Sequence, residues 1–295
     1  MLFTSFLACL LAASTAVPHA GSTLGRLPRP AAAGELAGRT IIFSVDDGYH
    51  SVYANIYPLL RRYRVPLTLG VIGDYLRGGT PRYEPSAGYM RRSEIRELID
   101  SCGIEVASHS LSHAYLTRLD SAAAWREIRG SKVLLESLFG GEVITFVYPY
   151  GDLNDRVVRQ VRAAGYRLGR AVRPGRVDFH HDPWRLPIVE LRLETGLEDI
   201  KQAIRARRVT ILLLHQVVEE PRYFTQWPLE DFTRLLEWLD AGGARVTTLR
   251  QLYREWWFDS VERILADAAA AFPDRRKRLL FENVQVDATQ APHPR

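Results

Sequence analysis

Two histidines four residues apart, His109 and His113, directly follow a short apolar run of the chain. Upstream, a second apolar run ends in the adjacent carboxylates Asp46 and Asp47. Two imidazoles and one carboxylate form a set of three protein ligands that leaves positions on a metal ion open for water and substrate. The second carboxylate could then take a proton from that water, so these residue types indicate a metal-assisted hydrolase.

Neither group is specific by itself, because paired histidines occur on surfaces and Asp-Asp-Gly often forms an ordinary turn. If residues 109–113 form a helical turn, positions i and i+4 share a face, and both rings point the same way. Each group follows an expected strand, and parallel strands open their carboxyl ends on one face of an α/β barrel. Two more segments, Tyr148–Gly151 and His215, also directly follow apolar runs, and we expect all four groups to meet.

Short apolar runs alternate with amphipathic stretches from Thr40 onward, with Ser121 and Asn154 as expected helix N-caps. The runs expected to be strands are residues 40–45, 67–72, 104–107, 143–147, 167–172, 186–191, 209–214 and 244–248. The stretches expected to be helices are residues 52–64, 92–101, 121–139, 153–164, 197–207 and 229–241. This alternation predicts a parallel sheet closed, or nearly closed, into an α/β barrel.

The chain has 295 residues and a net charge of +5, with its arginines scattered along the sequence, which does not point to nucleic acid. Residues 1–20 resemble a secretory signal, although their start lacks Lys and Arg, and their apolar part is too short to cross a bilayer. We therefore expect a periplasmic or secreted protein. The expected order is this signal, a linker over 21–39, a catalytic domain over 40–257, and a helix and tail over 258–295.

In order, these groups resemble the motifs of the polysaccharide deacetylases of carbohydrate esterase family 4, also called the NodB homology domain. The segments that carry the resemblance are residues 44–48, 108–113, 148–151 and 212–215. The resemblance covers roughly residues 40–257. It implies a distorted (β/α)7-8 barrel with a single catalytic domain that removes N-acetyl groups from an amino-sugar polysaccharide.

The resemblance also implies a metal site and an apolar pocket. Asp47, His109 and His113 would hold a divalent metal, usually zinc in this family, with cobalt, nickel or iron(II) as alternatives. Leu213 and its neighbours would line a small pocket for the acetyl methyl group.

Three further roles are implied for the reaction itself. Asp46 would be the general base, and His215 would be the general acid that protonates the departing amine. The backbone N–H of Tyr150 would stabilise the oxyanion.

The chain departs from the family pattern at the third motif, which usually begins with an arginine that pairs with the catalytic base. Val147 occupies that position here. The segment around Asp182, Trp184 and Arg185 resembles an altered fourth motif. We expect Arg185 to replace the missing arginine and Asp182 to orient His215; a loop contact is the alternative for both.

The Asp-Gly-Tyr sequence that ends in Tyr49 is similar to the subgroup that deacetylates poly-β-1,6-N-acetylglucosamine. Tyr49 and Trp184 are candidate surfaces for sugar stacking. A catalytically inactive glycan-binding module on the same fold remains an alternative, as do formamido sugars, acetylxylan and cyclic ureides as substrates. Iron oxygenases share the ligand set but place their carboxylate near the first histidine, unlike Asp47. The sequence does not indicate protein partners.

Overall fold

A computed structural model describes residues 34–77, 88–177 and 182–256 of the chain, and the structural findings refer to these residues. The expected signal over 1–20, most of the linker over 21–39 and the expected tail over 258–295 lie outside them. The stretches expected to carry the site are therefore described, apart from residues 78–87 and 178–181.

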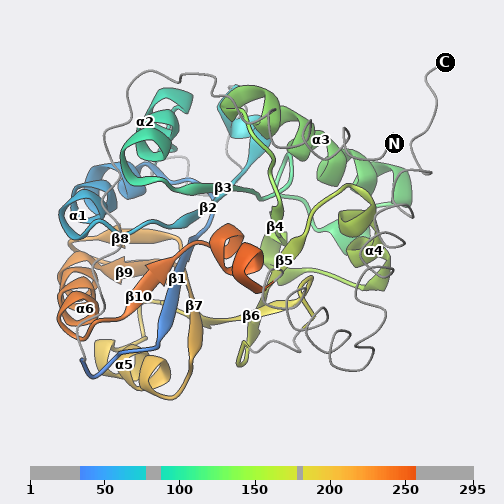
Figure 1. The fold of residues 1–295 in the computed structure, drawn as a ribbon. Coiled ribbons are helices and arrows are strands. Elements are labelled where there is room, and N and C mark those ends of the chain that lie inside the picture. Colours follow the sequence, from blue (N-terminus) through green and yellow to red (C-terminus); the bar gives the residue numbers. More distant parts are fainter. Residues whose placement is uncertain (1–33, 78–87, 178–181, 257–295) are drawn as a thin grey trace, which may run out of the picture. The chain divides into compact units, whose positions relative to one another are not determined.

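Seven parallel strands form a closed barrel, as the sequence predicts (Figure 1). The barrel closes because the first strand, β1, pairs with β2 on one side and with β7 on the other. The strands are β1 (Thr40–Val45), β2 (Thr68–Val71), β3 (Glu105–Ser108), β4 (Thr145–Val147), β5 (Leu168–Pro174), β6 (Leu186–Glu190) and β7 (Val209–Leu214). Buried strands of this kind read as continuous apolar runs, which is why the sequence revealed them.

One edge of β1 is shared between two other strands. The first half of β1, Thr40–Ile42, pairs with β10 (Arg245–Thr247), and its last two residues, Ser44 and Val45, pair with β2. The opposite edge pairs with β7 over the full length of β1. The strand that leads into Asp46 and Asp47 is thus held mainly by strands from the other end of the described chain.

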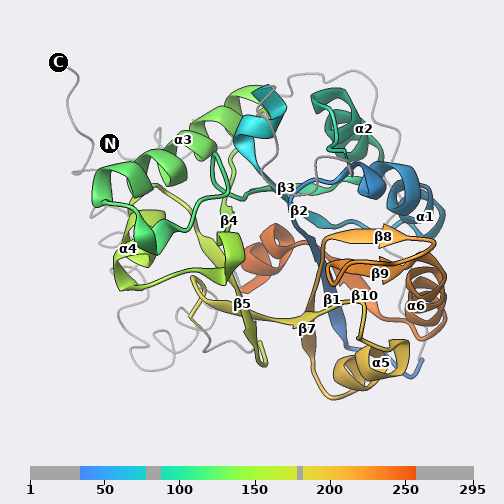
Figure 2. The ribbon, with the colours of Figure 1, turned by 180° about the vertical axis from the view of Figure 1, so that it is seen from behind.

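Helices follow most of the strands and cover the outside of the barrel (Figures 1 and 2). They are η1 (Val52–Ile56), α1 (Tyr57–Tyr63), η2 (Gly73–Arg77), α2 (Arg92–Cys102), η4 (Leu116–Arg118), α3 (Ser121–Phe139), η5 (Pro149–Gly151), α4 (Asp155–Ala163), α5 (Leu197–Arg205) and α6 (Leu229–Ala241). Asn154 caps α4 as expected, by accepting from the backbone N–H of Val157. The expected cap at Ser121 is wrong, because the neighbouring Asp120 accepts from Ala123 and caps α3.

Two short strands were not expected from the sequence. β8 (Gln216–Val218) begins directly after His215 and pairs in parallel with β9 (Gln226–Pro228). They lie beside α1 and α6, and the side-chain amide of Asn55 donates to the carbonyl oxygen of Val217 (Figure 2). This small sheet fixes the direction in which the chain leaves His215.

The barrel interior is apolar near its base and polar near the carboxyl ends of the strands. Along β7, Leu212 and Leu214 pack outward against the helices, whereas Ile211 and Leu213 face inward, as strand alternation requires. The inward cluster contains Ile42, Leu168, Leu186, Ile188, Ile211 and Leu213, together with Leu249 and Leu252 from a helix over 249–256. Leu213 therefore lies in the floor of the barrel beneath the motif residues.

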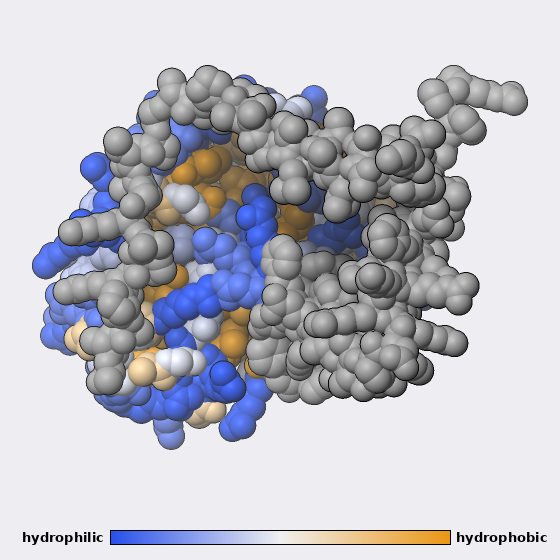
Figure 3. All heavy atoms as spheres, in the orientation of Figure 1, coloured by the Kyte–Doolittle hydropathy of each residue, from blue (hydrophilic) through white to orange (hydrophobic). Residues whose placement is uncertain are grey.

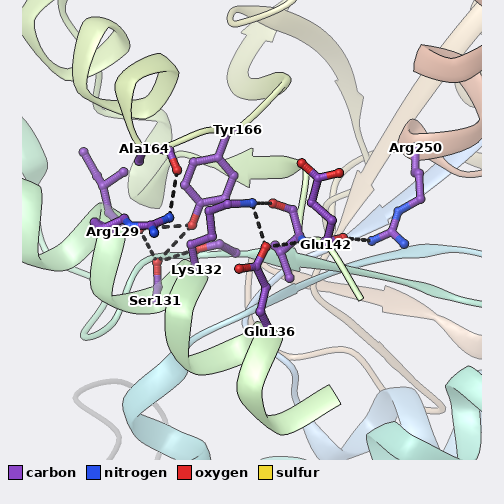
Figure 4. A network of polar contacts seen from close by, with 11 residues as sticks. Arg129, Ser131, Lys132, Glu136, Glu142, Ala164, Tyr166 and Arg250 are labelled. Atoms are coloured by element: carbon purple, nitrogen blue, oxygen red, sulfur yellow. Dashed lines mark hydrogen bonds and ion pairs between the residues drawn. The ribbon is translucent and has the colours of Figure 1, made fainter. Parts of the chain in front are cut away.

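A polar network anchors α3 to the neighbouring strands (Figure 4). The buried ammonium of Lys132 donates to the carbonyl oxygen of Val143, lies 2.8 Å from a carboxylate oxygen of Glu136, and sits over the ring of Tyr166. Next to it, the hydroxyls of Ser131 and Ser108 are 2.6 Å apart. Since Ser108 directly precedes His109, this contact ties the strand that leads into the histidine loop to α3.

On the face seen in Figure 3, the described side chains are mainly hydrophilic, with apolar side chains visible in the hollows between them. Within the described ranges, no helix combines the length and the apolar character needed to span a bilayer.

Candidate metal centre

Asp47, His109 and His113 bring three donor atoms together at the carboxyl ends of β1 and β3. The Nε2 atoms of the two histidines are 3.1 Å apart, and each lies 3.4 Å from Oδ1 of Asp47. Donors about 2 Å from a tetrahedral zinc ion lie roughly 3.3 Å from one another. The spacing and the nitrogen and oxygen donors therefore fit a divalent metal bound on one side by protein.

The Asp-Asp-Gly turn separates the two carboxylates. Asp47 and Gly48 both have left-handed backbone conformations, with φ of 71° and 80°, and the N–H of Gly48 donates to the carbonyl oxygen of Asp46. Glycine adopts such a conformation without strain, and aspartate tolerates it better than most residues. The turn sends Asp47 toward the histidines, whereas the neighbouring Asp46 is directed into the barrel.

The expected helical turn over 109–113 is wrong. The segment is an irregular loop in which Ser110 and His113 have positive φ values of 62° and 60°. The hydroxyl of Ser110 accepts from the backbone N–H of His113, and Gly73 donates to the carbonyl oxygen of Ser110. The two rings thus converge because of this loop geometry rather than because of helical spacing.

Glu127 on α3 holds the same loop from outside. One of its carboxylate oxygens accepts from the backbone N–H groups of Leu111 and Ser112 at 3.0 and 2.9 Å, and the other accepts from the Ser112 hydroxyl at 2.7 Å. Hydrogen bonds to a carboxylate are stronger than those between neutral groups. Glu127 was missed in the sequence because a helical glutamate carries no local sign of such a role.

The Nδ1 atom of His109 lies 2.8 Å from the carbonyl oxygen of Val147. A carbonyl oxygen can only accept, so Nδ1 carries a proton, and in the neutral ring Nε2 presents its lone pair toward Asp47 and His113, whereas in the charged ring it donates to Asp47. Orientation by a second partner is the usual arrangement of a metal-binding histidine. Val147, where an arginine was expected, therefore contributes through its backbone.

Burial and mutual charge shift the titration of the three ligands. Burial favours a neutral Asp47, but the hydrogen bond with His109 and the nearby histidine charges outweigh it and hold the pKa of Asp47 well below its usual range. Burial and the charge of His109 lower the pKa of His113 to about 4. Burial also acts to lower the pKa of His109, but the carboxylates of Asp46 and Asp47 prevail and raise it.

Asp46 is 2% exposed, and its Oδ2 atom lies 3.8 Å from Nε2 of His109. Its other oxygen, Oδ1, accepts from Nη2 of Arg170, a fully buried residue of β5. The expectation that Arg185 pairs with Asp46 is wrong, because Arg185 binds Asp182 and Asp155 instead. Arg170 lies in β5, which the sequence predicts as an apolar strand over residues 167–172.

The segment over 182–185 is built around its own contacts. Both carboxylate oxygens of Asp182 are engaged, one by the backbone N–H of Trp184 and one by Arg185. The expected orienting contact from Asp182 to His215 is therefore not observed, and within the described ranges Nδ1 of His215 has no hydrogen-bond partner. The guanidinium of Arg162 lies 4.3 Å from the ring centroid of Trp184 and so occupies one face of the ring that was expected to stack on sugar.

His215 and Tyr150 do join the cluster. His215 lies close enough that its charge lowers the pKa of both Asp47 and His113. Tyr150 has a left-handed backbone with φ of 58°, and its ring stacks on Tyr115 and lies 4.4 Å from the ring of His113, centroid to centroid.

Tyr49, by contrast, offers little surface to a substrate. Its ring is only 4% exposed and stacks on Tyr89 at 4.9 Å between centroids. The two residues also form an antiparallel bridge, so Tyr49 ties the Asp-Asp-Gly turn to the segment that contains Tyr89. The expectation that it stacks on sugar is therefore not supported.

With this geometry established, comparison with known proteins gives a consistent result. Residues 33–169, which contain the aspartates, both histidines and the Tyr-Pro-Tyr-Gly turn, match the family model described as polysaccharide deacetylase. This part of the chain belongs to the polysaccharide deacetylase family. Among curated relatives, the poly-beta-1,6-N-acetyl-D-glucosamine N-deacetylase of Staphylococcus aureus (strain MSSA476) is 24% identical over 160 residues, covering 50% of this chain and 54% of the relative. The chain spans about half the length of the curated relatives that it matches.

Solved structures agree on the fold of the chain. A family 4 carbohydrate esterase from Bacillus anthracis superposes with a TM-score of 0.52 at 17% identity, covering 75% of this chain and 85% of that one. The Xyl-CE4 domain of a multidomain xylanase from the hindgut metagenome of Trinervitermes trinervoides gives 0.51 at 19% identity, covering 74% and 90%. These likenesses establish the shared barrel.

Proposed function

We propose that this protein is a metal-dependent hydrolase that removes acetyl groups from an N-acetylated amino-sugar polysaccharide. The observation that carries the proposal is the convergence of Asp47, His109 and His113 beside a separately held carboxylate, Asp46. A ligand set with open positions next to a carboxylate that is not itself a ligand is what amide hydrolysis by water requires.

A divalent ion held by Asp47, His109 and His113, zinc by preference, would supply an acidified water and a polarised acetyl carbonyl. Asp46 takes the proton of the water as the water oxygen adds to the carbonyl carbon. The backbone N–H of Tyr150 stabilises the resulting oxyanion, and Leu213 lines the floor below the acetyl group.

His215 then donates a proton to the nitrogen as the carbon–nitrogen bond breaks. Acetate and the free amine of the sugar leave, and the balance is one water consumed for each amide cleaved. An amine leaves only when protonated, which is why a histidine close to Asp47 and His113 suits this step.

The family membership and the Staphylococcus aureus relative favour a β-1,6-linked N-acetylglucosamine polymer over acetylxylan, formamido sugars or cyclic ureides. The resemblance of residues 1–20 to a secretory signal fits a periplasmic or secreted enzyme acting on such a polymer.

Acetate release from β-1,6- and β-1,4-linked N-acetylglucosamine oligomers and from acetylxylan tests the proposal. We expect release from the β-1,6-linked oligomers, loss of activity in excess chelator and recovery with zinc, cobalt, nickel or iron(II). Full activity in chelator would contradict the metal role, and binding of glycan without any turnover would indicate an inactive glycan-binding module.

Two substitutions separate the neighbouring carboxylates. Asp46→Asn should retain metal and lose turnover, because only the base is removed, whereas Asp47→Ala should lose metal. A normal rate in Asp46→Asn would show that the base has been misassigned, and His215→Ala with an unchanged kcat would do the same for the acid.

A further inference from the structure

Arg170 is an unusual residue for the interior of a barrel, since a buried guanidinium needs a compensating charge. It is fully buried, and the ion pair with Asp46 joins two side chains that lie 124 positions apart in the chain. Among the described residues, its Nε and Nη1 atoms find no hydrogen-bond partner. The contact with Asp46 is thus the interaction that accounts for a charge at this depth.

The strand register explains how Arg170 reaches Asp46. In the parallel pairing of β4 and β5, Val147 is the direct partner of Arg170, so both side chains point to the same side of the sheet. A Cβ atom placed on Gly70 of β2 would lie 3.3 Å from Oδ1 of Asp46 and 3.5 Å from Cγ2 of Val147. Positions 147 and 170 therefore border the same space around the Asp46 carboxylate.

The family pattern has an arginine at position 147, and the register partner of that position on the neighbouring strand is Arg170. An arginine at either position of this strand pair points into the barrel at the same level. Arg170 on the neighbouring strand β5 therefore provides the positive charge beside Asp46 that an arginine at position 147 would provide.

The two oxygens of Asp46 are consequently assigned to different tasks. Oδ1 binds Arg170, while Oδ2 is on the side of the ligands, 3.8 Å from Nε2 of His109. A carboxylate next to Asp47 in sequence could otherwise turn and become a fourth protein ligand. The ion pair keeps Asp46 at a distance from which it can act on water.

We propose that Arg170 is the positioning residue for the base Asp46, and that it holds this carboxylate back from the metal. The inference rests on the proposed function for its catalytic part, while its effect on metal binding can be measured whether or not the substrate is known.

The test compares Arg170→Met with the exchange variant Val147→Arg/Arg170→Val, with Arg170→Val alone, and with Arg156→Met. Arg156 is a half-buried arginine that binds three backbone carbonyls of the loop before α3, and it serves as the matched control. The readouts are kcat and KM on the acetylated oligomer and the dissociation constant for zinc measured against a chromophoric chelator.

For Arg170→Met we expect kcat to fall by about 100-fold or more, in the range of a lost general base, with little change in KM. Its zinc dissociation constant should stay equal or become smaller, because a released Asp46 can join the ligands. The exchange variant should recover at least about tenfold in kcat over Arg170→Val. Arg156→Met should change neither quantity beyond about threefold.

A kcat for Arg170→Met within threefold of wild type would overturn the inference, and so would a clear loss of zinc affinity in a folded variant. If Arg170→Met does not fold, the exchange variant decides: near-wild-type kcat supports the role, and a 100-fold loss in folded protein refutes it. If wild-type protein releases no acetate from any substrate, the proposed function fails, whereas the zinc affinities still test the restraint on Asp46.

Discussion

Replacing Glu127 should weaken metal binding although this residue contacts no ligand side chain. Its carboxylate accepts three hydrogen bonds from Leu111 and Ser112, which lie between the two candidate metal ligands His109 and His113. Each bond to a charged acceptor contributes about 1.5–3 kcal/mol. The loop keeps its backbone bonds to Gly73 and Asp74 and the bond between Ser110 and His113, so only part of this total is lost.

For Glu127→Ala we therefore expect the dissociation constant for zinc to rise about 10- to 100-fold, the usual effect of losing an outer-shell partner. This corresponds to about 1.4–2.8 kcal/mol of binding free energy. In Glu127→Gln the amide oxygen can accept from both backbone N–H groups while its NH₂ donates to the Ser112 hydroxyl. That variant loses only the charge, and its affinity should drop less than about tenfold.

Zinc affinity measured by competition with a chromophoric chelator checks both variants, with melting temperature recorded alongside. Glu136→Ala is the matched control, because Glu136 lies on the same helix and binds Lys132 and the backbone of Val143. It should lower the melting temperature without changing zinc affinity. Wild-type zinc affinity in Glu127→Ala would refute the idea that α3 holds the histidine loop in place.

Two further predictions concern pH and stability. Because the pKa of His109 is raised, its proton competes with metal, and zinc affinity should fall about tenfold per pH unit below that pKa. His113 has a pKa of about 4, so its protonation should lower zinc affinity further only in more acidic solution. Titrations between pH 5 and 8 that show constant affinity would contradict this. Burial raises the pKa of Glu105, although the hydrogen bonds that its carboxylate accepts from Thr145, Thr68 and the backbone N–H of Arg250 act to lower it. The protonated carboxyl therefore stabilises the folded protein at low pH, and this stabilisation is lost as pH rises through the folded-state pKa. Glu105→Gln should flatten that dependence in urea unfolding, whereas Glu105→Ala should cost about 2–4 kcal/mol, and an equal loss in both variants would count against this account.

The barrel and the meeting of its polar side chains were predictable because their signals are local. Buried parallel strands are apolar runs, and the polar residues that end them, Asp46, Asp47, His109 and His215, stand out directly after those runs. The closed order of strands then follows from the rules of α/β folds.

The partner of Asp46 was not predictable in the same way. The expectation for Arg185 rested on its place in the altered fourth motif. The ion pair with Asp46 depends instead on which residue of β5 is the register partner of Val147 in β4. Strand register of this kind is fixed by the assembled barrel. The available signal was Arg170 itself, a charged residue between Gly169 and Ala171 in a strand that is otherwise buried.

The loop over 109–113 shows a second limit. Four-residue spacing suggested a helical turn, yet the backbone is set by positive φ values and by Glu127, which is distant in sequence. Interactions across such distances override local spacing, so the sequence predicted which side chains would meet but not the backbone geometry that brings them together.

The pairing of β1 also has a consequence for the order in which the protein is made. A chain leaves the ribosome amino end first. β1 is then complete early, but its full-length neighbour β7 and its other neighbour β10 lie at residues 209–214 and 245–247. Pairing across such sequence distances forms late. A nascent chain ending after residue 169 would hold every candidate metal ligand and yet leave β1 joined only through Ser44 and Val45. We therefore expect newly made chains to acquire metal and activity only when synthesis is nearly finished, which keeps incomplete chains inert.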